Sequence, residues 1–415
     1  MNTSPACEGW VKLAASLRIG GPISIHQSED ADRTPGRLPP PAYNRRMHSS
    51  PDVLVRGSGC VGRALALALG MQGLRVALLA LPQKETAEDV RTYALNAASV
   101  ALLRELKVWD SLAEDAVTPV YDMQVAGDEA GAALAFSSWQ QGVSQLACIV
   151  DAAELERQLA AALRYSPHVQ SVGEPVPAAL TALCEGRDSA GREALGVRFE
   201  PRAYGQRAIA ARLSSDKPHE GKAWQWFRSP DVLALLPFDR PLKGASYGLV
   251  WSLPDERADE FLKLDPADFE GELAAATGNA AGSLKLASGL SNWPLALARA
   301  EPLLGPGWVL LGDAAHLVHP LAGQGLNLGL ADVAALARVI RERESWRPLG
   351  DERLLRRYER ERLAATFAMG ELTDGLLRLF ASDTPLLRTL RNRGLATLDA
   401  LPPLKRWLTS QALGV

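Results

Sequence analysis

A glycine pattern near residue 60 constrains the fold of this chain more than any other feature. Residues 53–55 predict a short buried strand, residues 61–72 an alanine-rich helix, and residues 75–79 a second strand. The turn between the first strand and the helix carries three spaced glycines: Gly57, Gly59 and Gly62. In such a βαβ unit the first glycine permits a tight turn, the second lets a diphosphate approach the backbone, and the third lets helix and strand pack closely. The pattern predicts a dinucleotide site; a purely structural glycine turn is the alternative.

One expected part of this unit is absent. Such units usually end the second strand with an acidic residue that binds the adenosine ribose. Here Leu81 stands at the strand end, and the nearest acid is Glu85. We therefore expect the adenosine ribose to be held more weakly than in a complete unit.

A second motif covers residues 308–327. The predicted strand Trp308–Leu311 runs into Gly312 and Asp313, and a glycine-rich loop then opens a helix over about residues 325–344. This arrangement resembles the second flavin-binding motif of the p-hydroxybenzoate hydroxylase class of flavoproteins. The resemblance implies that Asp313 accepts a hydrogen bond from the ribityl chain of FAD. It also implies that amides near residues 325–327 face the pyrimidine edge of the flavin, where a helix N-terminus stabilises negative charge.

The remaining segments narrow the family to the hydroxylases of ubiquinone biosynthesis, which the chain resembles over about residues 50–412. The segments that carry this resemblance are Arg91-x-Tyr93-Ala94-Leu95-Asn96-x-x-Ser99, Arg356-Arg357-Tyr358-Glu359-x-x-Arg362, Thr373-Asp374-Gly375-Leu376, Leu390-Arg391-Asn392-x-Gly394-Leu395 and Leu401-Pro402-Pro403-Leu404-Lys405. The resemblance implies that Arg91 lies against the flavin, and that two residues lie at its reacting face: Pro320 and Gly323. The implied cofactor-binding residues are Gly57, Gly59, Gly62, Arg91, Gly312, Asp313, Ala314, Gly323, Gln324, Gly325, Leu326 and Asn327.

Two residues depart from the family pattern. Glu185 precedes Gly186 where the family has an Asp-Gly motif, and Arg56 stands where the family prefers an apolar residue or glycine. The segment before Glu185 also looks several strands short. These departures are expected to affect the binding of the adenosine part of FAD and the reaction with the nicotinamide cofactor more than the binding of the isoalloxazine ring.

The order of elements predicts an α/β fold, with a Rossmann-like FAD-binding domain, an inserted antiparallel-sheet substrate domain and a C-terminal helical region. Residues 1–46, rich in proline and charge, are expected to be a disordered extension. The expected boundaries are 47–200 and 301–345 for the FAD-binding domain, 201–300 for the substrate domain and 346–415 for the helical region. Residues 91–115 are expected to be helical, because their leucines recur near helical spacing.

The resemblance implies an FAD-dependent monooxygenase that uses NAD(P)H and O2 to hydroxylate an aromatic small molecule, with a prenylated phenol as the expected substrate. Other hypotheses are a degenerate FAD-binding accessory or scaffold protein of the same pathway, a monooxygenase acting on another aromatic compound, and an NAD-dependent dehydrogenase. The last uses only the first glycine motif and leaves the Gly312-Asp313 segment unexplained.

Composition limits the remaining possibilities. The formal net charge of -3 gives no indication of a nucleic-acid partner, and four scattered cysteines without CxxC spacing indicate neither a zinc site nor a disulfide framework. No membrane-spanning run is visible, so we expect a cytoplasmic protein. Leucines interleaved with arginines over residues 376–393 predict peripheral contact with the inner face of the membrane or with a quinone-pathway protein; a helix packed on the core is the alternative. His316 and His319 are expected to pack locally, and Trp224, Trp226 and Trp251 to line a ring pocket or to pack in the core.

Overall fold

The computed structural model describes residues 50–80, 89–127, 133–318 and 324–363. All of them belong to one compact unit, residues 50–415. The predictions made for residues 1–46, for Leu81 and Glu85, for His319 and for residues 376–393 lie outside the described residues.

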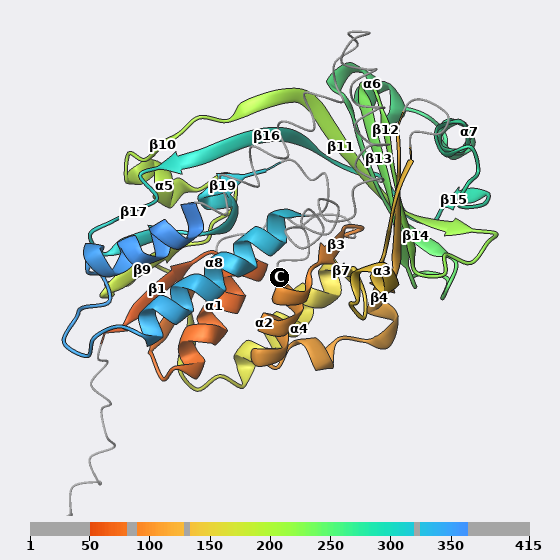
Figure 1. Ribbon diagram of the computed structural model, residues 1–415. Coiled ribbons are helices and arrows are strands. Elements are labelled where there is room, and N and C mark those ends of the chain that lie inside the picture. The colour runs from red at the N-terminus through yellow and green to blue at the C-terminus, as the bar shows by residue number, and fades with distance from the viewer. Residues whose placement is uncertain (1–49, 81–88, 128–132, 319–323, 364–415) are drawn as a thin grey trace, which may run out of the picture. The chain divides into compact units, whose positions relative to one another are not determined.

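A six-stranded sheet contains the predicted βαβ unit (Figure 1). Its strands are β1 (Val53–Arg56), β2 (Val76–Leu79), β8 (Val169–Val172), β9 (Leu180–Leu183), β17 (Leu304–Gly305) and β18 (Trp308–Leu310), in the order β17-β18-β9-β1-β2-β8. All pairings are parallel except that of β17 with β18. Helices α1 (Cys60–Met71) and α8 (Gln324–Arg341) lie side by side against this sheet. The buried alanines and leucines of α1 pack there, which explains its nearly all-apolar sequence.

A ten-stranded, mostly antiparallel sheet forms the other half of the unit. Its strands are β5 (Asp122–Ala126), β6 (Ala133–Ser137), β10 (Arg198–Phe199), β11 (Arg202–Ser215), β12 (Lys222–Arg228), β13 (Asp231–Phe238), β14 (Ser246–Pro254), β15 (Leu284–Leu286), β16 (Ser291–Glu301) and β19 (His316–Leu317). The antiparallel sheet predicted within residues 201–300 is confirmed by the pairings of β11, β12, β13 and β14. Strands β5 and β6, which precede the predicted substrate domain in sequence, belong to this sheet as well.

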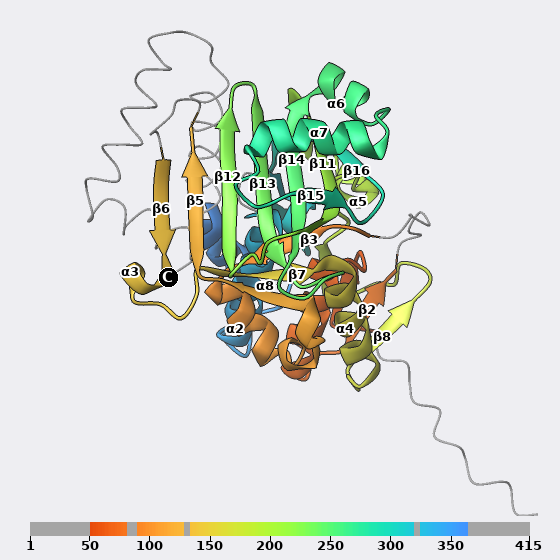
Figure 2. The same ribbon diagram turned by 90° about the vertical axis from the view of Figure 1, so that its right-hand side faces the viewer.

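The two faces of this sheet have different partners. Trp251 packs edge-on against Phe261 and Phe269, which come from helices α6 (Asp255–Phe261) and α7 (Pro266–Thr277). Figure 2 shows these helices beside the sheet. Because successive side chains of a strand point to opposite faces, Val250 and Ala234 face away from these helices. The second face is therefore free to line a cavity.

A small sheet of β3 (Thr92–Leu95), β7 (Ala147–Asp151) and β4 (Val117–Val120) pairs antiparallel throughout. The expectation of a helix over residues 91–115 is confirmed only over residues 97–105: residues 92–95 pair with β7 as a strand, and residues 109–111 and 114–116 form short 3-10 turns. Helix α2 (Ala97–Glu105) begins only after Asn96, whose side chain accepts a hydrogen bond from Ser99 N at 2.9 Å. Helix α4 (Ala152–Arg164) follows β7 directly, and residues 352–363 are helical.

The fold class is confirmed, since a parallel βαβ sheet and a larger antiparallel sheet share one compact unit. None of the helices among the described residues is long and apolar enough to cross a membrane.

Candidate active site

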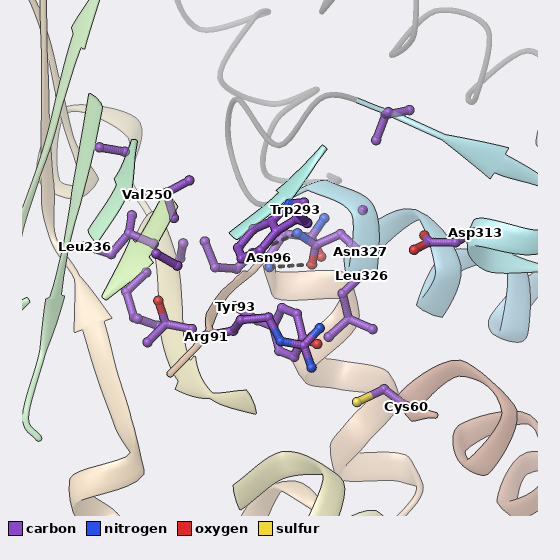
Figure 3. Close-up of a pocket in the computed structure, with 18 of the residues that line it drawn as sticks. Cys60, Arg91, Tyr93, Asn96, Leu236, Val250, Trp293, Asp313, Leu326 and Asn327 are labelled. Carbon is purple, nitrogen blue, oxygen red and sulfur yellow. Dashed lines mark hydrogen bonds between the residues drawn. The ribbon is translucent and has the colours of Figure 1, made fainter. Parts of the chain in front are cut away.

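A cavity of about 650 Å³ lies where the loops after β1, β9 and β18 face the ten-stranded sheet. The carboxyl ends of parallel strands are the usual place for a ligand in such sheets. Figure 3 shows Asp313 at one side of the cavity and Leu236 and Val250 at the other, with Trp293 and Tyr93 between them. The two sides therefore differ in chemistry.

The glycine loop has the tight turn and the close packing predicted for its first and third glycines. Gly57 has a positive φ of 106°, and a Cβ there would lie 2.3 Å from the carbonyl oxygen of Cys184. A Cβ on Gly62 would lie 1.9 Å from Gly57 O. A Cβ on Gly59, in contrast, would have no atom within 4 Å, and Gly59 lines the cavity. The first and third glycines thus close the turn, and the second leaves the backbone open to a ligand at the N-terminus of α1.

The Gly312–Ala314 turn presents an acidic group to the cavity. Asp313 lines the cavity and is exposed to it. Burial among the surrounding protein atoms raises the pKa of this carboxyl, although His316, Arg187 and Arg91 act in the opposite direction. A carboxylate in this position is suited to accept hydrogen bonds from the hydroxyls of a ligand.

Buried charges hold the turn from behind. Asp332 of α8 is completely buried and accepts hydrogen bonds from Gly312 N at 2.9 Å, from Arg362 Nε at 2.6 Å and, through the same oxygen as Gly312, from His316 Nε2 at 2.7 Å. Burial raises the pKa of Asp332, but the opposite effect of His316, Arg362 and the Gly312 amide is larger, so the net shift of this pKa is downward. Burial lowers the pKa of His316, but Asp332 outweighs it and the net shift is upward. The expectation that His316 packs locally agrees with these contacts.

A second set of contacts joins α8 to the segment around Asn96. Asn327 Oδ1 accepts hydrogen bonds from Asn96 N at 3.1 Å and Ser99 Oγ at 2.7 Å, and Asn327 Nδ2 donates to Ala94 O at 2.8 Å. The side chain of Asn327 thus connects α8 with β3 and α2, and the predicted contact with the flavin falls to the backbone of residues 325–327. These bonds explain why Asn96 and Ser99 occur together in the motif.

Arg91 lines the same cavity and is fixed by a neighbouring acid. Its guanidinium makes two bonds to Asp89, Nε to Oδ1 at 2.8 Å and Nη2 to Oδ2 at 2.7 Å. Asp89 raises the pKa of Arg91, which stays charged. Arg91 also lies 5.8 Å from the centre of the Tyr93 ring. The cavity therefore has a fixed positive charge near its polar side.

The structure brings together most of the residues implied to bind a cofactor. Those that line the cavity are Gly59, Arg91, Gly312, Asp313, Gly325, Leu326 and Asn327. Gly57, Gly62 and Ala314 shape the turns behind it. Gln324 begins α8, and Pro320 and Gly323 lie outside the described residues. Among the described residues, no group of three or more histidine, cysteine or acidic side chains could hold a metal ion.

Sequence reasoning missed the apolar side of the cavity. Of the three tryptophans considered, Trp226 and Trp251 pack in the core on the helix-covered face of the sheet, and Trp224, which borders the cavity, stacks its ring on Trp226. Trp293, which was not considered, lines the cavity. The other apolar residues of the wall are Val120, Met123, Phe136, Leu146, Ile149, Ala210, Ala223, Ala234, Leu236, Val250 and Leu295. The only signal for them was period-two alternation, which does not say which face of a strand meets a ligand.

Comparison with known proteins agrees with this geometry. A family model for an FAD binding domain matches residues 50–172 and 162–372. The 3-demethoxyubiquinol 3-hydroxylase of Escherichia coli is 30% identical over 393 residues, covering 88% of this chain and 98% of that protein. Ubiquinone hydroxylase UbiL of Rhodospirillum rubrum is 29% identical, covering 88% and 89%. The crystal structure of PqsL from Pseudomonas aeruginosa with 2-aminobenzoylacetate has a TM-score of 0.69 at 20% identity, covering 84% of this chain and all of that one.

The fold and the cavity define a flavoprotein, and the chain belongs to the FAD-binding-domain family. It is an FAD-dependent oxidoreductase of the monooxygenase type. The resemblance to ubiquinone-biosynthesis hydroxylases and the FAD cofactor are thereby confirmed, and a dehydrogenase that uses only the first glycine motif is not supported.

Proposed function

We propose that this protein hydroxylates the aromatic ring of a prenylated phenol in ubiquinone biosynthesis, with NAD(P)H and O2 as co-substrates. The observation that carries the proposal is the two-sided lining of one cavity. Polar groups gather at the Gly59 and Asp313 side, while apolar side chains from the ten-stranded sheet line the other. The two curated relatives are named for hydroxylation in ubiquinone metabolism, which agrees with this division.

The residues at the polar side fit FAD. The Gly59 backbone and the N-terminus of α1 would receive the diphosphate, and Asp313 would accept a hydrogen bond from a ribityl hydroxyl. Bound FAD supplies the electron transfer and the oxygen activation that no side chain can provide. The protein's own contribution is then to bind and orient the two molecules and to exclude water.

The apolar side fits a ring with a hydrocarbon substituent. Trp293 offers a flat surface for a ring, and Leu236 and Val250 line the wall beyond. Burial of apolar groups contributes about 0.8 kcal/mol for each methylene. A single fully buried prenyl unit of five carbons, worth about 4 kcal/mol, should therefore tighten binding by a factor on the order of 1,000. The same wall keeps water from the reacting ring.

The proposal is tested with two phenols that differ only in a prenyl substituent. We expect both to perturb the visible spectrum of the holoprotein and to stimulate NAD(P)H oxidation, the prenylated one at a much lower concentration. Leu236→Asp should abolish this difference while FAD content stays normal, since Leu236 lies on the apolar side.

Two outcomes would refute parts of the proposal. Equal affinity for the two phenols would indicate another aromatic substrate. Tightly bound FAD without any ligand-stimulated NAD(P)H oxidation would indicate the accessory or scaffold protein instead.

We also propose that the protein meets its substrate at the inner face of a membrane or on another protein of the pathway, because a prenylated phenol resides in lipid. The arginines over residues 388–393 are the sequence-based candidates for this contact. Replacement of Arg388, Arg391 and Arg393 by Glu should reduce co-sedimentation with anionic vesicles and leave FAD content unchanged. Unaltered co-sedimentation would exclude this segment.

A further inference from the structure

The two departures from the family pattern, Arg56 and Glu185, are in contact with each other. Arg56 Nε lies 2.7 Å from Glu185 Oε1 at the carboxyl ends of the neighbouring parallel strands: Arg56 is the last residue of β1, and Glu185 follows β9 by two residues. The two atoms form an ion pair and not a directed hydrogen bond. The side chain of Glu185 is 0% exposed and that of Arg56 is 24% exposed. A carboxylate so deeply buried requires compensation, and Arg56 supplies the opposite charge.

The other oxygen of Glu185 organises the chain that follows. Glu185 Oε2 accepts hydrogen bonds from Ser189 Oγ at 2.6 Å and from Gly191 N at 2.7 Å. Ser189 Oγ in turn accepts a hydrogen bond from Arg192 N at 3.1 Å and caps helix α5 (Ala190–Ala194). A Cβ on Gly191 would lie 2.9 Å from Glu185 Oε2 and 3.1 Å from Arg56 Cζ, so glycine lets the ion pair and the helix approach. Glu185 therefore fixes where α5 begins.

Arg192 of helix α5 connects this helix to the turn that contains Asp313. Arg192 is buried, and its guanidinium lies 3.6 Å from the centre of the Phe199 ring. Arg192 Nη1 donates to Ala314 O at 3.1 Å, and Nη2 donates to Arg187 O at 2.9 Å. The Gly312–Ala314 turn is thus held at both ends, at the Gly312 amide by Asp332 and at the Ala314 carbonyl by Arg192.

We propose that Arg56, Glu185 and Arg192 form a relay that positions the Gly312–Ala314 turn for FAD. The relay starts at the residue before Gly57 and ends at Ala314, so it couples the two FAD-binding motifs. All three are positioning residues, since they act through the turn. Arg56 and Glu185 each depart from the family pattern when considered alone, but together they form one complementary ion pair. The proposal rests on FAD binding and is independent of the ring hydroxylation proposed above.

The test measures FAD dissociation from the holoprotein by the fluorescence of released flavin, with the visible spectrum of the bound flavin and the melting temperature. Arg56→Met leaves Glu185 buried and uncompensated, and we expect FAD to dissociate roughly tenfold faster or more. Adding Glu185→Gln should restore most of the wild-type rate, because a glutamine oxygen can still accept from Ser189 and Gly191 and no charge is left unpaired. Arg192→Met should speed dissociation and shift the flavin bands, whereas Arg192→Lys should retain part of both.

Arg75 provides the matched control. Its Nη2 lies 2.7 Å from Asp52 Oδ1, an equally short but more exposed ion pair at the opposite ends of β1 and β2. Arg75→Met should leave FAD dissociation and the flavin spectrum unchanged.

The proposal is wrong if Arg56→Met and Arg192→Met lower the melting temperature but keep the wild-type dissociation rate and spectrum. It is equally wrong if Glu185→Gln fails to rescue Arg56→Met. Because no substrate is present, neither result bears on ring hydroxylation.

Discussion

Alanine at Gly59 should separate cofactor binding from folding. Gly59 has φ of -74° and ψ of -177°, which alanine adopts without strain, and its Cβ would meet no atom within 4 Å. The apoprotein of Gly59→Ala should therefore be as stable as wild type, or more stable by about 0.4–1 kcal/mol. The new methyl group would project where the diphosphate approaches the backbone. Losing one charge-assisted hydrogen bond there costs about 1.5–3 kcal/mol, so FAD affinity should fall roughly 10- to 150-fold.

Gly62→Ala is the matched comparison. Its Cβ would lie 1.9 Å from Gly57 O, so helix α1 must move by more than 1 Å relative to the turn. Such overpacking costs about 1–3 kcal/mol or more, so this variant should lose thermal stability even without FAD. The assay is fluorescence titration of each apoprotein with FAD, beside its melting curve. Wild-type FAD affinity in Gly59→Ala, or a strongly destabilised Gly59→Ala apoprotein, would refute the assignment of the diphosphate to this loop.

Three further predictions concern the Gly312–Ala314 turn and the buried charges behind it. Asp332→Asn leaves Arg362 without its buried partner and should lower the unfolding free energy measured in urea by about 3–5 kcal/mol. Glu361→Gln removes an exposed pair with Arg338 and should change the unfolding free energy by less than about 1 kcal/mol. Similar losses of stability in the two variants would contradict this account. The folded-state pKa of His316 is raised above its ordinary value of 6.5, so its pairing with Asp332 stabilises the fold fully below pH 6.5. This stabilisation is lost as the pH rises through the raised pKa. The difference in unfolding free energy between wild type and His316→Gln should therefore shrink from pH 5.5 to 8.5, and a constant difference would count against the pairing. Because Asp313 is exposed to the cavity in the apoprotein, Asp313→Asn should leave the melting temperature of the apoprotein nearly unchanged while FAD affinity falls, and unchanged FAD affinity would argue against its contact with the cofactor.

Local patterns in the sequence predicted the two turns at the polar side of the cavity. The glycine loop is a short-range motif whose spacing is set by one turn and one helix, so Gly57, Gly59 and Gly62 could be assigned roles directly. The Gly312-Asp313 turn is local in the same way. Its supports are not local, because Arg192 and Asp332 come from separate helices and meet only in the folded chain.

Other features depend on long-range pairing and escaped prediction. The strand β3 precedes the leucines at helical spacing and was assigned to the same helix; its pairing with β7, more than 50 residues away, makes it a strand. Strands β5 and β6 join the ten-stranded sheet through the parallel pairing of β5 with β12. Arg56 and Glu185 lie far apart in sequence, so each was interpreted separately as a departure from the family pattern. The sequence alone gave no indication that the two side chains are in contact.

The central claim is most directly tested by the product formed from a prenylated phenol. The holoprotein is supplied with NAD(P)H under oxygen-18 gas, and the product is analysed by mass spectrometry. The account predicts a product that gains a single oxygen atom, carries the heavy isotope and is hydroxylated on the ring. Bound and reducible FAD with consumption of NAD(P)H but no labelled ring product would contradict it.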